Sequence, residues 1–287
     1  MAAREPAPVL AACGLAFEAA LAAGPGVVAV CGPGPARLGE WLEALLDERR
    51  GERLAPRCDP WRDVPLDPWR DGRHDAQLDE RADARAGARH AAEPTGPVVA
   101  GTEDPPPRAD PAWAGIISFG CAGALDPDLA PGTCVLATGV QTADGFLSAD
   151  AAWLCNLARR LPDAVHGELA GLDAPLMTVG GKAALWRSSG ACAVDMESHA
   201  AARFAQRHGL PFAACRVVLD PAWRGVPPCA LAGMRPDGGS APWPLLRALS
   251  AAPDQLGLLG MLACDAWRAR RALGRVRARL GARLAAP

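Results

Sequence analysis

Short apolar runs that end at turn residues alternate with helical patterns along the first part of the chain. One apolar run covers residues 9–13 and ends at Gly14, and a second covers residues 26–31 and ends at a Gly-Pro-Gly turn. Both runs predict buried strands, because a strand that is enclosed on both faces needs no polar alternation. From Pro35 onward, Trp41 and four leucines recur at helical spacing, which predicts a helix.

A segment of different character interrupts this pattern between Asp47 and Ala112. It is dense in Arg, Asp, Glu and Pro, poor in Ile, Val and Phe, and repeats the run Asp-Pro-Trp-Arg-Asp at residues 59–63 and 67–71. Such a segment has too little apolar surface to offset the entropy that ordering costs. We therefore expect a largely disordered insertion with one short helical turn between residues 76 and 90; alternatively, its two Trp side chains anchor it to the body or to a partner.

Strands and helices alternate again after the insertion. Strands are expected at residues 115–120, 133–138 and 212–219, with a weaker one at 175–179, and helices at 149–161, 182–188, 196–208 and 255–280. This order predicts an α/β fold around a mixed, mainly parallel sheet, with the insertion in a helix-to-strand loop. The predicted parts are residues 1–46 and 113–287 of one domain, separated by the insertion at 47–112.

The composition limits the classes of function. A formal net charge of -2 and a pI near 6.2 give no overall field that attracts nucleic acid or an anionic membrane. The ten Cys are scattered without C-x-x-C pairs or zinc-site spacing, so we expect no metal and interpret the thiols as small apolar residues of a reducing cytoplasm. No signal-peptide pattern or membrane-span pattern is present. These observations predict a soluble, cytoplasmic protein that does not bind nucleic acid.

Three motifs that are candidates for binding or catalysis lie where predicted strands end. The run Ser-Phe-Gly-Cys-Ala-Gly-Ala at residues 118–124 is a Gly-rich loop whose backbone N–H groups can approach a ligand closely. The run Val-Asp-Met-Glu-Ser-His at residues 194–199 places acidic residues at the start of an apolar helix, and residues 215–220 form a buried strand that ends in Asp220. Each motif alone has a structural alternative: a tight turn, a helix cap at Asp195 and an Asp-Pro turn, respectively.

Taken together, the motifs resemble those of the superfamily of purine nucleoside phosphorylases and methylthioadenosine nucleosidases, whose members carry a Gly-rich loop, a V-(D/E)-M-E helix start and an R-x-x-S-D strand end in this order. The wording Ser-Phe-Gly-x-Ala-Gly-x-Leu-Asp-Pro, the run Val-Asp-Met-Glu-Ser-His and the Asp-Pro-Ala after the last strand are most similar to the hopanoid-associated phosphorylases. The resemblance covers residues 8 to about 46 and 113 to about 274. It implies a nucleoside phosphorylase-like, three-layer α/β domain.

The resemblance also implies roles for individual residues in cleaving a ribosyl N-glycosidic bond. Asp220 would hold or donate the proton at adenine N7, Glu197 would accept hydrogen bonds from the ribose hydroxyls, and Met196 would pack on the sugar. Glu18 matches the carboxylate that orients the attacking water in nucleosidases. Alternation places Arg216 on the same strand face as Asp220 but about 13 Å away, too far for direct pairing. Backbone groups of the Gly-rich loop would flank base and sugar at Gly120, Cys121, Ala122 and Gly123.

Several positions depart from the family pattern. In the phosphorylases an Arg near the first loop and a hydroxyl in the Gly-rich loop serve phosphate, whereas this chain has Ala19, Ala20 and Cys121 there. A phosphate would then depend on backbone N–H groups alone. We therefore expect hydrolysis, with phosphate left open as a co-substrate and no other cofactor. Leu219 replaces the family Ser before the catalytic Asp, and Ala124 replaces the second Gly.

Three hypotheses about the substrate remain open. The first is cleavage of the adenine–ribose bond of adenosylhopane in hopanoid biosynthesis, which the resemblance implies. The second is a nucleosidase or phosphorylase for a small soluble purine nucleoside such as methylthioadenosine. The third is an inactive homologue that binds a lipid or a partner, and the presence of Glu18, Glu197 and Asp220 argues against it.

The segment after Gln255 combines leucines at helical spacing with seven arginines between residues 268 and 283. Such a basic amphipathic helix can lie on an anionic membrane, which would suit a lipid-linked nucleoside and a peripheral place at the inner membrane. The alternative is a helix packed on the domain with a solvated Arg face. The superfamily often builds sites at subunit contacts, which makes a homo-oligomer a further expectation.

Overall fold

The computed structural model describes residues 6–32, 34–50, 113–235 and 238–287. Helix α2 (Pro35–Arg50) continues into the first residues of the expected insertion. The remainder of that insertion, with its repeated Trp-containing run, lies outside the described residues. Within the described ranges, no helix is both long enough and apolar enough to cross a membrane.

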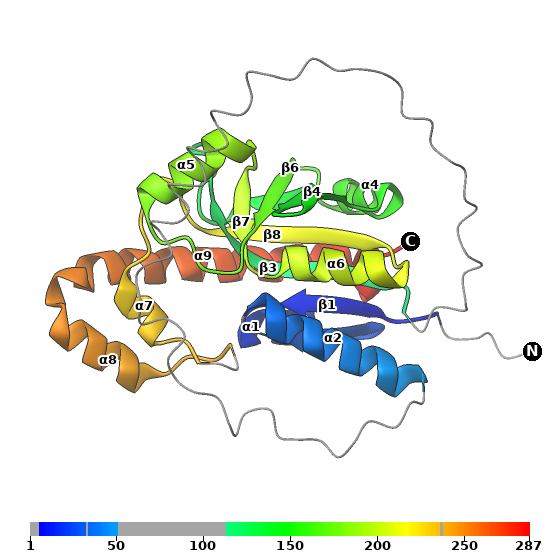
Figure 1. Cartoon of the computed structure of the whole chain (residues 1–287), viewed down its shortest axis with the longest axis horizontal. Helices are drawn as coiled ribbons and strands as arrows, with labels where there is room; N and C mark the ends of the chain where they lie inside the picture. The colour runs from blue at the N-terminus through cyan, green and yellow to red at the C-terminus, as the bar shows by residue number, and fades with distance from the viewer. Residues whose placement is uncertain (1–5, 33, 51–112, 236–237) are drawn as a thin grey trace, which may run out of the picture.

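One eight-stranded sheet organises the described residues (Figure 1). Its strands are β1 (Val9–Cys13), β2 (Val27–Cys31), β3 (Gly115–Ala124), β4 (Cys134–Thr142), β5 (Gly145–Ser148), β6 (Val165–Gly171), β7 (Ala193–Asp195) and β8 (Phe212–Asp220). The order is β2-β1-β3-β7-β6-β4-β5, and β8 pairs with both β3 and β4. Five pairings are parallel, whereas β3–β7, β4–β5 and β4–β8 are antiparallel. The predicted α/β fold with a mixed, mainly parallel sheet is confirmed.

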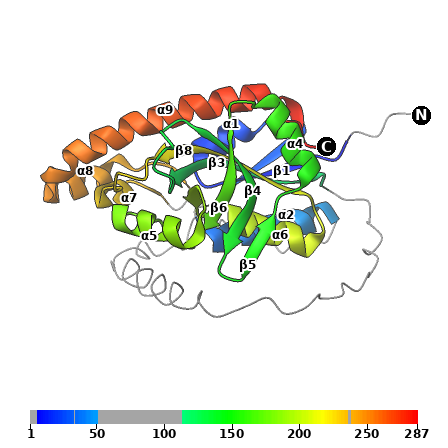
Figure 2. The ribbon, with the colours of Figure 1, turned by 90° about the horizontal axis from the view of Figure 1, so that it is seen from above.

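Helices cover both faces of the sheet and give three layers (Figure 2). One face carries α2 and α6 (Ser198–His208); the other carries α1 (Ala16–Ala22), α4 (Ala151–Arg160) and the second half of α9 (Leu256–Leu280). Strand β1 is apolar throughout because both of its faces are covered. Leu10 and Ala12 pack in the core beneath α2 and α6, and Val9 and Ala11 pack in the core beneath α1, α4 and α9. Three further helices are α5 (Val179–Ser189), α7 (Pro228–Ala232) and α8 (Pro242–Ala251).

The structure corrects several local predictions. Residues 118–124 do not form a loop, because β3 continues through them. The strand predicted at 175–179 is wrong: the side chain of Thr178 accepts a hydrogen bond from the N–H of Gly181 and begins α5 instead. Strands β5, β6 and β7 and helices α7 and α8 are additional to the predicted elements. The other helices expected after the insertion are present, with ends shifted by a few residues.

Candidate active site

Strand β3 forms the centre of the candidate site. Strand β8 runs parallel beside it, with Arg216 opposite Gly120 and Asp220 opposite Gly123. The register shifts between Ala122 and Gly123, so a bulge interrupts the pairing. The side chains of β8 nevertheless alternate as far as Leu219, which packs against the same core cluster as Cys215 and Val217, whereas Val218 lies in the other cluster. That Arg216 and Asp220 share one face stays a prediction. The prediction that they do not pair directly holds, because among the described residues each has other partners.

Glu18 is fixed at the start of α1 by three backbone donors. The N–H groups of Gly14 and Leu15 donate to its Oε2 at 3.0 Å each, and the N–H of Cys121 on β3 donates to its Oε1 at 2.8 Å. Burial raises the pKa of Glu18, although Arg216 and the backbone donors oppose this rise. The carboxyl group that is expected to orient water thus lies against the Gly-rich part of β3.

Arg216 is the buried cation around which acidic side chains gather. Its Nε lies 2.6 Å from Asp195 Oδ2, and its Nη2 lies 3.2 Å from Glu197 Oε2. The same Nη2 donates to the hydroxyl of Ser118 at 2.5 Å. Burial lowers the pKa of Arg216, but Asp195 and the other nearby carboxylates raise it above its ordinary value. The guanidinium therefore stays charged and holds the acidic groups together.

Glu197 lies at the N-terminal end of α6, directly after the half-buried Met196. Burial raises the pKa of Glu197 to about 8; Arg216 opposes this rise and Asp195 adds to it. Asp195 accepts a hydrogen bond from the N–H of Ser198 at 2.9 Å in addition to its contact with Arg216. Asp195 therefore acts as a local cap and as a member of the charged cluster at the same time.

Charged side chains lie so close to two glycines that any larger residue at these positions would clash with them. A Cβ atom at Gly14 would lie 2.5 Å from Glu197 Oε1. A Cβ atom at Gly120 would lie 2.7 Å from Arg216 Nη1 and would also overlap the carboxylate of Glu18. Carbon cannot approach these atoms so closely without displacing them, so glycine at both positions makes the observed cluster possible.

Asp220 is paired with a lysine that the motifs do not include. The fully buried Nζ of Lys182 contacts Asp220 Oδ2 and donates to the backbone oxygens of Pro221 and Arg224 at 2.9 Å each. Asp220 also lies beside Gly123, where a Cβ atom would be 3.1 Å from Oδ2. The sequence does contain a signal for this residue, since Lys182 is the only lysine among 30 Lys and Arg residues.

The structure thus places the expected side chains in two groups along β3. One group joins Glu18 and Glu197 to Arg216, and the other joins Asp220 to Lys182. Such a site can donate a proton at one end and hold hydroxyl groups or a water molecule at the other. In the part of the chain that is described, no three His, Cys, Asp or Glu side chains are grouped as a metal site needs. The four residues whose backbone is expected to flank base and sugar lie on β3 between the two groups: Gly120, Cys121, Ala122 and Gly123.

Comparison with known proteins agrees with this architecture. Residues 113–228 match the sequence model of the phosphorylase superfamily. The matched range contains β3, the start of α6 and the end of β8, and hence most of the candidate site. A search of curated protein sequences finds no match.

Several solved structures are similar to this chain at low sequence identity. A mutant of Helicobacter pylori MTAN with 5'-methylthioadenosine in its active site is 11% identical, over 94% of this chain and 98% of that chain, with a TM-score of 0.53. The S-adenosylhomocysteine nucleosidase of Streptococcus pyogenes is 14% identical over 77% and 86%, with a TM-score of 0.49. A futalosine hydrolase mutant of Helicobacter pylori is 19% identical over 39% of this chain and 60% of that chain, with a TM-score of 0.38. The first likeness identifies a nucleoside phosphorylase-like fold.

Proposed function

We propose that this chain is an enzyme that cleaves the adenine–ribose N-glycosidic bond of a nucleoside. The reaction needs an acid for the departing base, contacts to the ribose hydroxyls and a positioned nucleophile. The observation that most supports the proposal is that Glu18 lies at Gly120 and Cys121 of β3 and Asp220 at Gly123, while Arg216, opposite Gly120, holds Glu197. This arrangement lies within the range that matches the phosphorylase superfamily, apart from Glu18. These groups supply the three requirements at opposite ends of one strand segment.

Asp220 is the proposed acid for the departing adenine. Lys182 holds Oδ2, while Oδ1 has no partner among the described residues and is available to N7 of the base. Lys182 contacts the carboxylate and two backbone oxygens, so it acts as a positioning residue. Its contacts take over the orienting part that a polar neighbour at Leu219 would play.

Glu197 and Glu18 are proposed to bind the sugar and the nucleophile. Glu197 accepts hydrogen bonds from the ribose hydroxyls, and Met196 packs on the sugar. The carboxylate of Glu18 is held in one direction by three N–H donors, and each carboxylate oxygen has further capacity to accept a hydrogen bond from water. Glu18 therefore orients a water molecule for attack on the ribose.

Water is the proposed nucleophile because the one arginine of the cluster is already occupied. The guanidinium of Arg216 is fully buried and donates to carboxylates, to Ser118 and, at 3.4 Å, to the backbone oxygen of Cys121. A phosphate anion would have to displace one of these partners and then lie among the remaining carboxylates. Both effects disfavour phosphorolysis.

For the substrate, we propose adenosylhopane, which would make the protein a peripheral inner-membrane enzyme of hopanoid biosynthesis. The residues that resemble hopanoid-associated phosphorylases support this choice. The Helicobacter pylori MTAN mutant that holds 5'-methylthioadenosine supports the alternative of a small soluble nucleoside. We also propose that the protein is cytoplasmic and that it assembles into a homo-oligomer.

Adenine release tests these assignments. The purified full-length chain is incubated separately with adenosylhopane, adenosine and 5'-methylthioadenosine, without phosphate and then with phosphate added. We expect release from adenosylhopane without phosphate and its loss in Asp220→Asn. Release from a soluble nucleoside alone supports the alternative substrate, and a requirement for phosphate identifies a phosphorylase. A folded protein that releases adenine from none of them is a binding homologue.

A further inference from the structure

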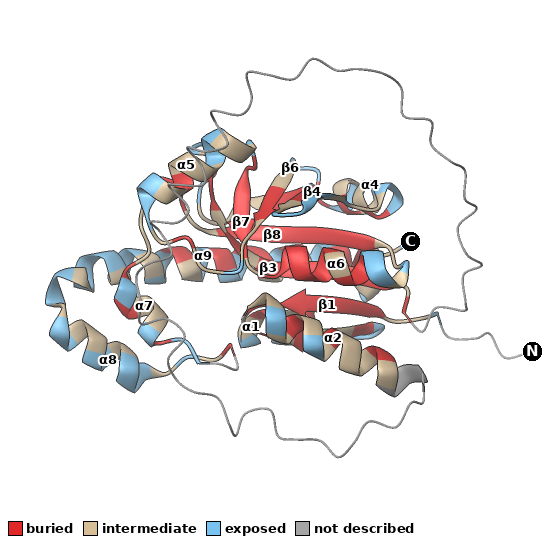
Figure 3. Cartoon of the chain, viewed as in Figure 1, coloured by how far each residue is buried: buried red, intermediate tan, exposed pale blue. Residues whose placement is uncertain are grey.

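A pair of helices at one end of the molecule carries an apolar surface that no described part of the chain covers. We call residues 242–264 the helical hairpin: it comprises α8, the turn at Pro253–Gln255 and the first part of α9. None of its residues is buried (Figure 3). Trp243 is 80% exposed and Leu256 61% exposed, and Leu246 and Met261 are exposed as well. Several large apolar side chains exposed on one short segment indicate a contact surface.

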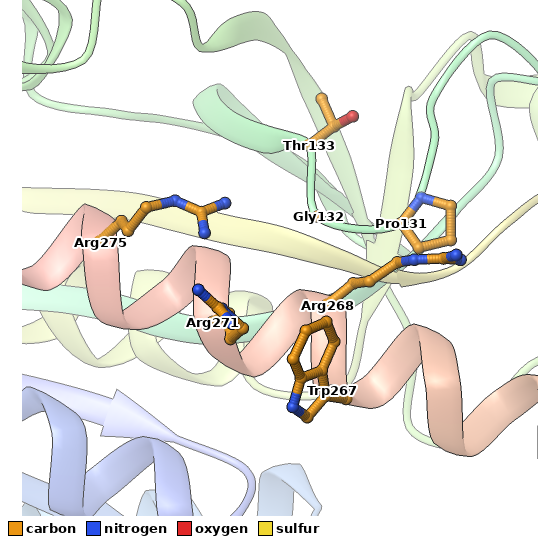
Figure 4. Close-up of a pocket in the computed structure, with 7 residues that line it drawn as sticks. All are labelled: Pro131, Gly132, Thr133, Trp267, Arg268, Arg271 and Arg275. Atoms are coloured by element: carbon orange, nitrogen blue, oxygen red, sulfur yellow. The ribbon is translucent and has the colours of Figure 1, made fainter.

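The second part of α9 continues the exposed surface with basic side chains. Arg268, Arg271 and Arg275 line a cavity of about 430 Å³ together with Trp267 and residues 131–133 (Figure 4). We call this cavity the basic groove; it shares no residue with the candidate active site. The guanidinium carbon of Arg271 lies 4.9 Å from the centre of the Trp267 ring. The groove therefore combines an aromatic side chain with three cations, a combination that suits an anionic head group.

The charge of this region differs in sign from that of the whole chain. Residues 242–280 contain seven arginines and two aspartates, although the complete chain has a formal net charge of -2. One of these aspartates, Asp265, is buried and paired with Arg224 and Arg268. The exposed surface beside the apolar hairpin is therefore strongly positive, and its complement is a negatively charged partner.

We propose that the helical hairpin and the basic groove dock the protein on the surface of an anionic phospholipid bilayer. Trp and Leu side chains enter the interfacial layer, where amphipathic helices bury their apolar faces, and the arginines contact lipid phosphates. A second copy of this chain fits less well, because a symmetric contact would set the same excess of positive charge against itself. Charge complementarity thus selects the bilayer.

Docking in this way brings the candidate active site close to the bilayer. The base of the hairpin is tied to the segment after Asp220, because the N–H of Cys229 donates to Gln255 Oε1 at 3.0 Å and Arg224 pairs with Asp265 of α9. Arg224 in turn supplies a backbone oxygen to Lys182. The docking proposal specifies the surface for the peripheral membrane place included in the proposed function, but it does not depend on the reaction or on the nucleoside.

Flotation with vesicles tests the proposal on the full chain without any nucleoside. We expect co-flotation with vesicles that contain phosphatidylglycerol and phosphatidylcholine, weaker binding at high salt, and little binding to phosphatidylcholine alone. Trp243→Ser with Leu256→Ser should abolish binding. Arg271→Gln and Arg275→Gln should each weaken binding about five-fold, since one basic residue near an anionic surface contributes about a factor of five in affinity.

Matched controls lie elsewhere on the surface. Phe146→Ser removes a 48% exposed aromatic side chain from β5, and Arg159→Gln removes an exposed arginine from α4; neither should change flotation. Circular dichroism verifies that each variant is folded. The proposal is overturned if the parent protein does not float with anionic vesicles, or if the controls weaken binding as much as the hairpin and groove variants do. It is also overturned if Trp243→Ser instead abolishes self-association measured by sedimentation, which would assign the surface to a second copy.

Discussion

Replacing Lys182 by Met tests whether this lysine positions Asp220. Methionine keeps a long apolar side chain but removes the charge and the three hydrogen-bond donors. In the parent protein these donors serve Asp220 and the backbone oxygens of Pro221 and Arg224. The variant leaves the carboxylate without its cation and two carbonyl groups without a donor, in a place where Nζ is fully buried.

We expect Lys182→Met to lower both the free energy of unfolding and the rate of adenine release, each by a different mechanism. Removing one partner of a buried ion pair costs about 3 to 5 kcal/mol, and we expect the lower end because the side chain of Asp220 is 14% exposed and can be hydrated. General acid catalysis contributes about 100-fold to 10,000-fold, so a misoriented acid should slow the chemical step by about 100-fold or more. Because Lys182 acts through Asp220, adding Asp220→Asn should cause little further loss.

The assay is single-turnover adenine release at a temperature and pH where urea titration shows that the variant is folded. Nucleoside affinity is measured separately, and it should change much less than the rate. The pH–rate profile of the folded variant should also differ from that of the parent, which a purely structural lysine would not cause. If Lys182→Met is less stable but releases adenine at the parent rate, or if its effect adds fully to that of Asp220→Asn, the positioning role is refuted.

Three further predictions concern the rest of the site. Asp220→Asn should slow adenine release about 100-fold to 10,000-fold with little change in nucleoside binding, whereas Glu197→Gln should weaken both, as single-turnover rates and equilibrium binding would show. Gly120→Ala should displace Glu18 and lower activity strongly, whereas Gly180→Ala, whose Cβ atom meets nothing within 4 Å, should not; equal activities would contradict the geometry. Burial raises the pKa of Glu197 from 4.5 to about 8, so the folded state binds more protons than the unfolded state between these values. The free energy of unfolding should therefore fall as pH rises through this window, and Glu197→Gln should flatten the fall in urea titrations.

The sequence predicts the buried strands well and the short or polar ones poorly. Strand β1 is apolar on both faces and β8 is apolar apart from Arg216 and Asp220, so their runs are conspicuous. Strand β6 reads Val-His-Gly-Glu-Leu-Ala-Gly and β7 has only three residues, and neither pattern suffices for a prediction. Residues 118–124 have the composition of a loop, but pairing with β8 on one side and β7 on the other makes them strand. Tertiary pairing here overrides local preference.

The candidate site shows the same division. Resemblance identifies Glu18, Glu197 and Asp220, because motifs record which residue types occur at which place. Their partners depend on contacts between distant segments: Arg216 meets Asp195 and Glu197 because β3 pairs with both β8 and β7. The bulge in the pairing of β3 with β8 next to Asp220 is also invisible in the sequence. The isolated lysine in an arginine-rich chain is the one partner that composition could have indicated.

Charge balance links the raised pKa values of the site to the proposed reaction. Asp195 pairs with the single positive charge of Arg216, and burial raises the pKa of Glu18 and of Glu197, so the ionised forms of these two groups are less favoured here than in water. As the glycosidic bond breaks, the ribose becomes positive, and a positive charge beside Glu197 favours its ionised form. The site therefore interacts more strongly with the cationic transition state than with the neutral substrate, as rate acceleration requires. A phosphate anion would cancel this advantage, because it would compete with the carboxylates for Arg216 and repel them, and water carries no such penalty.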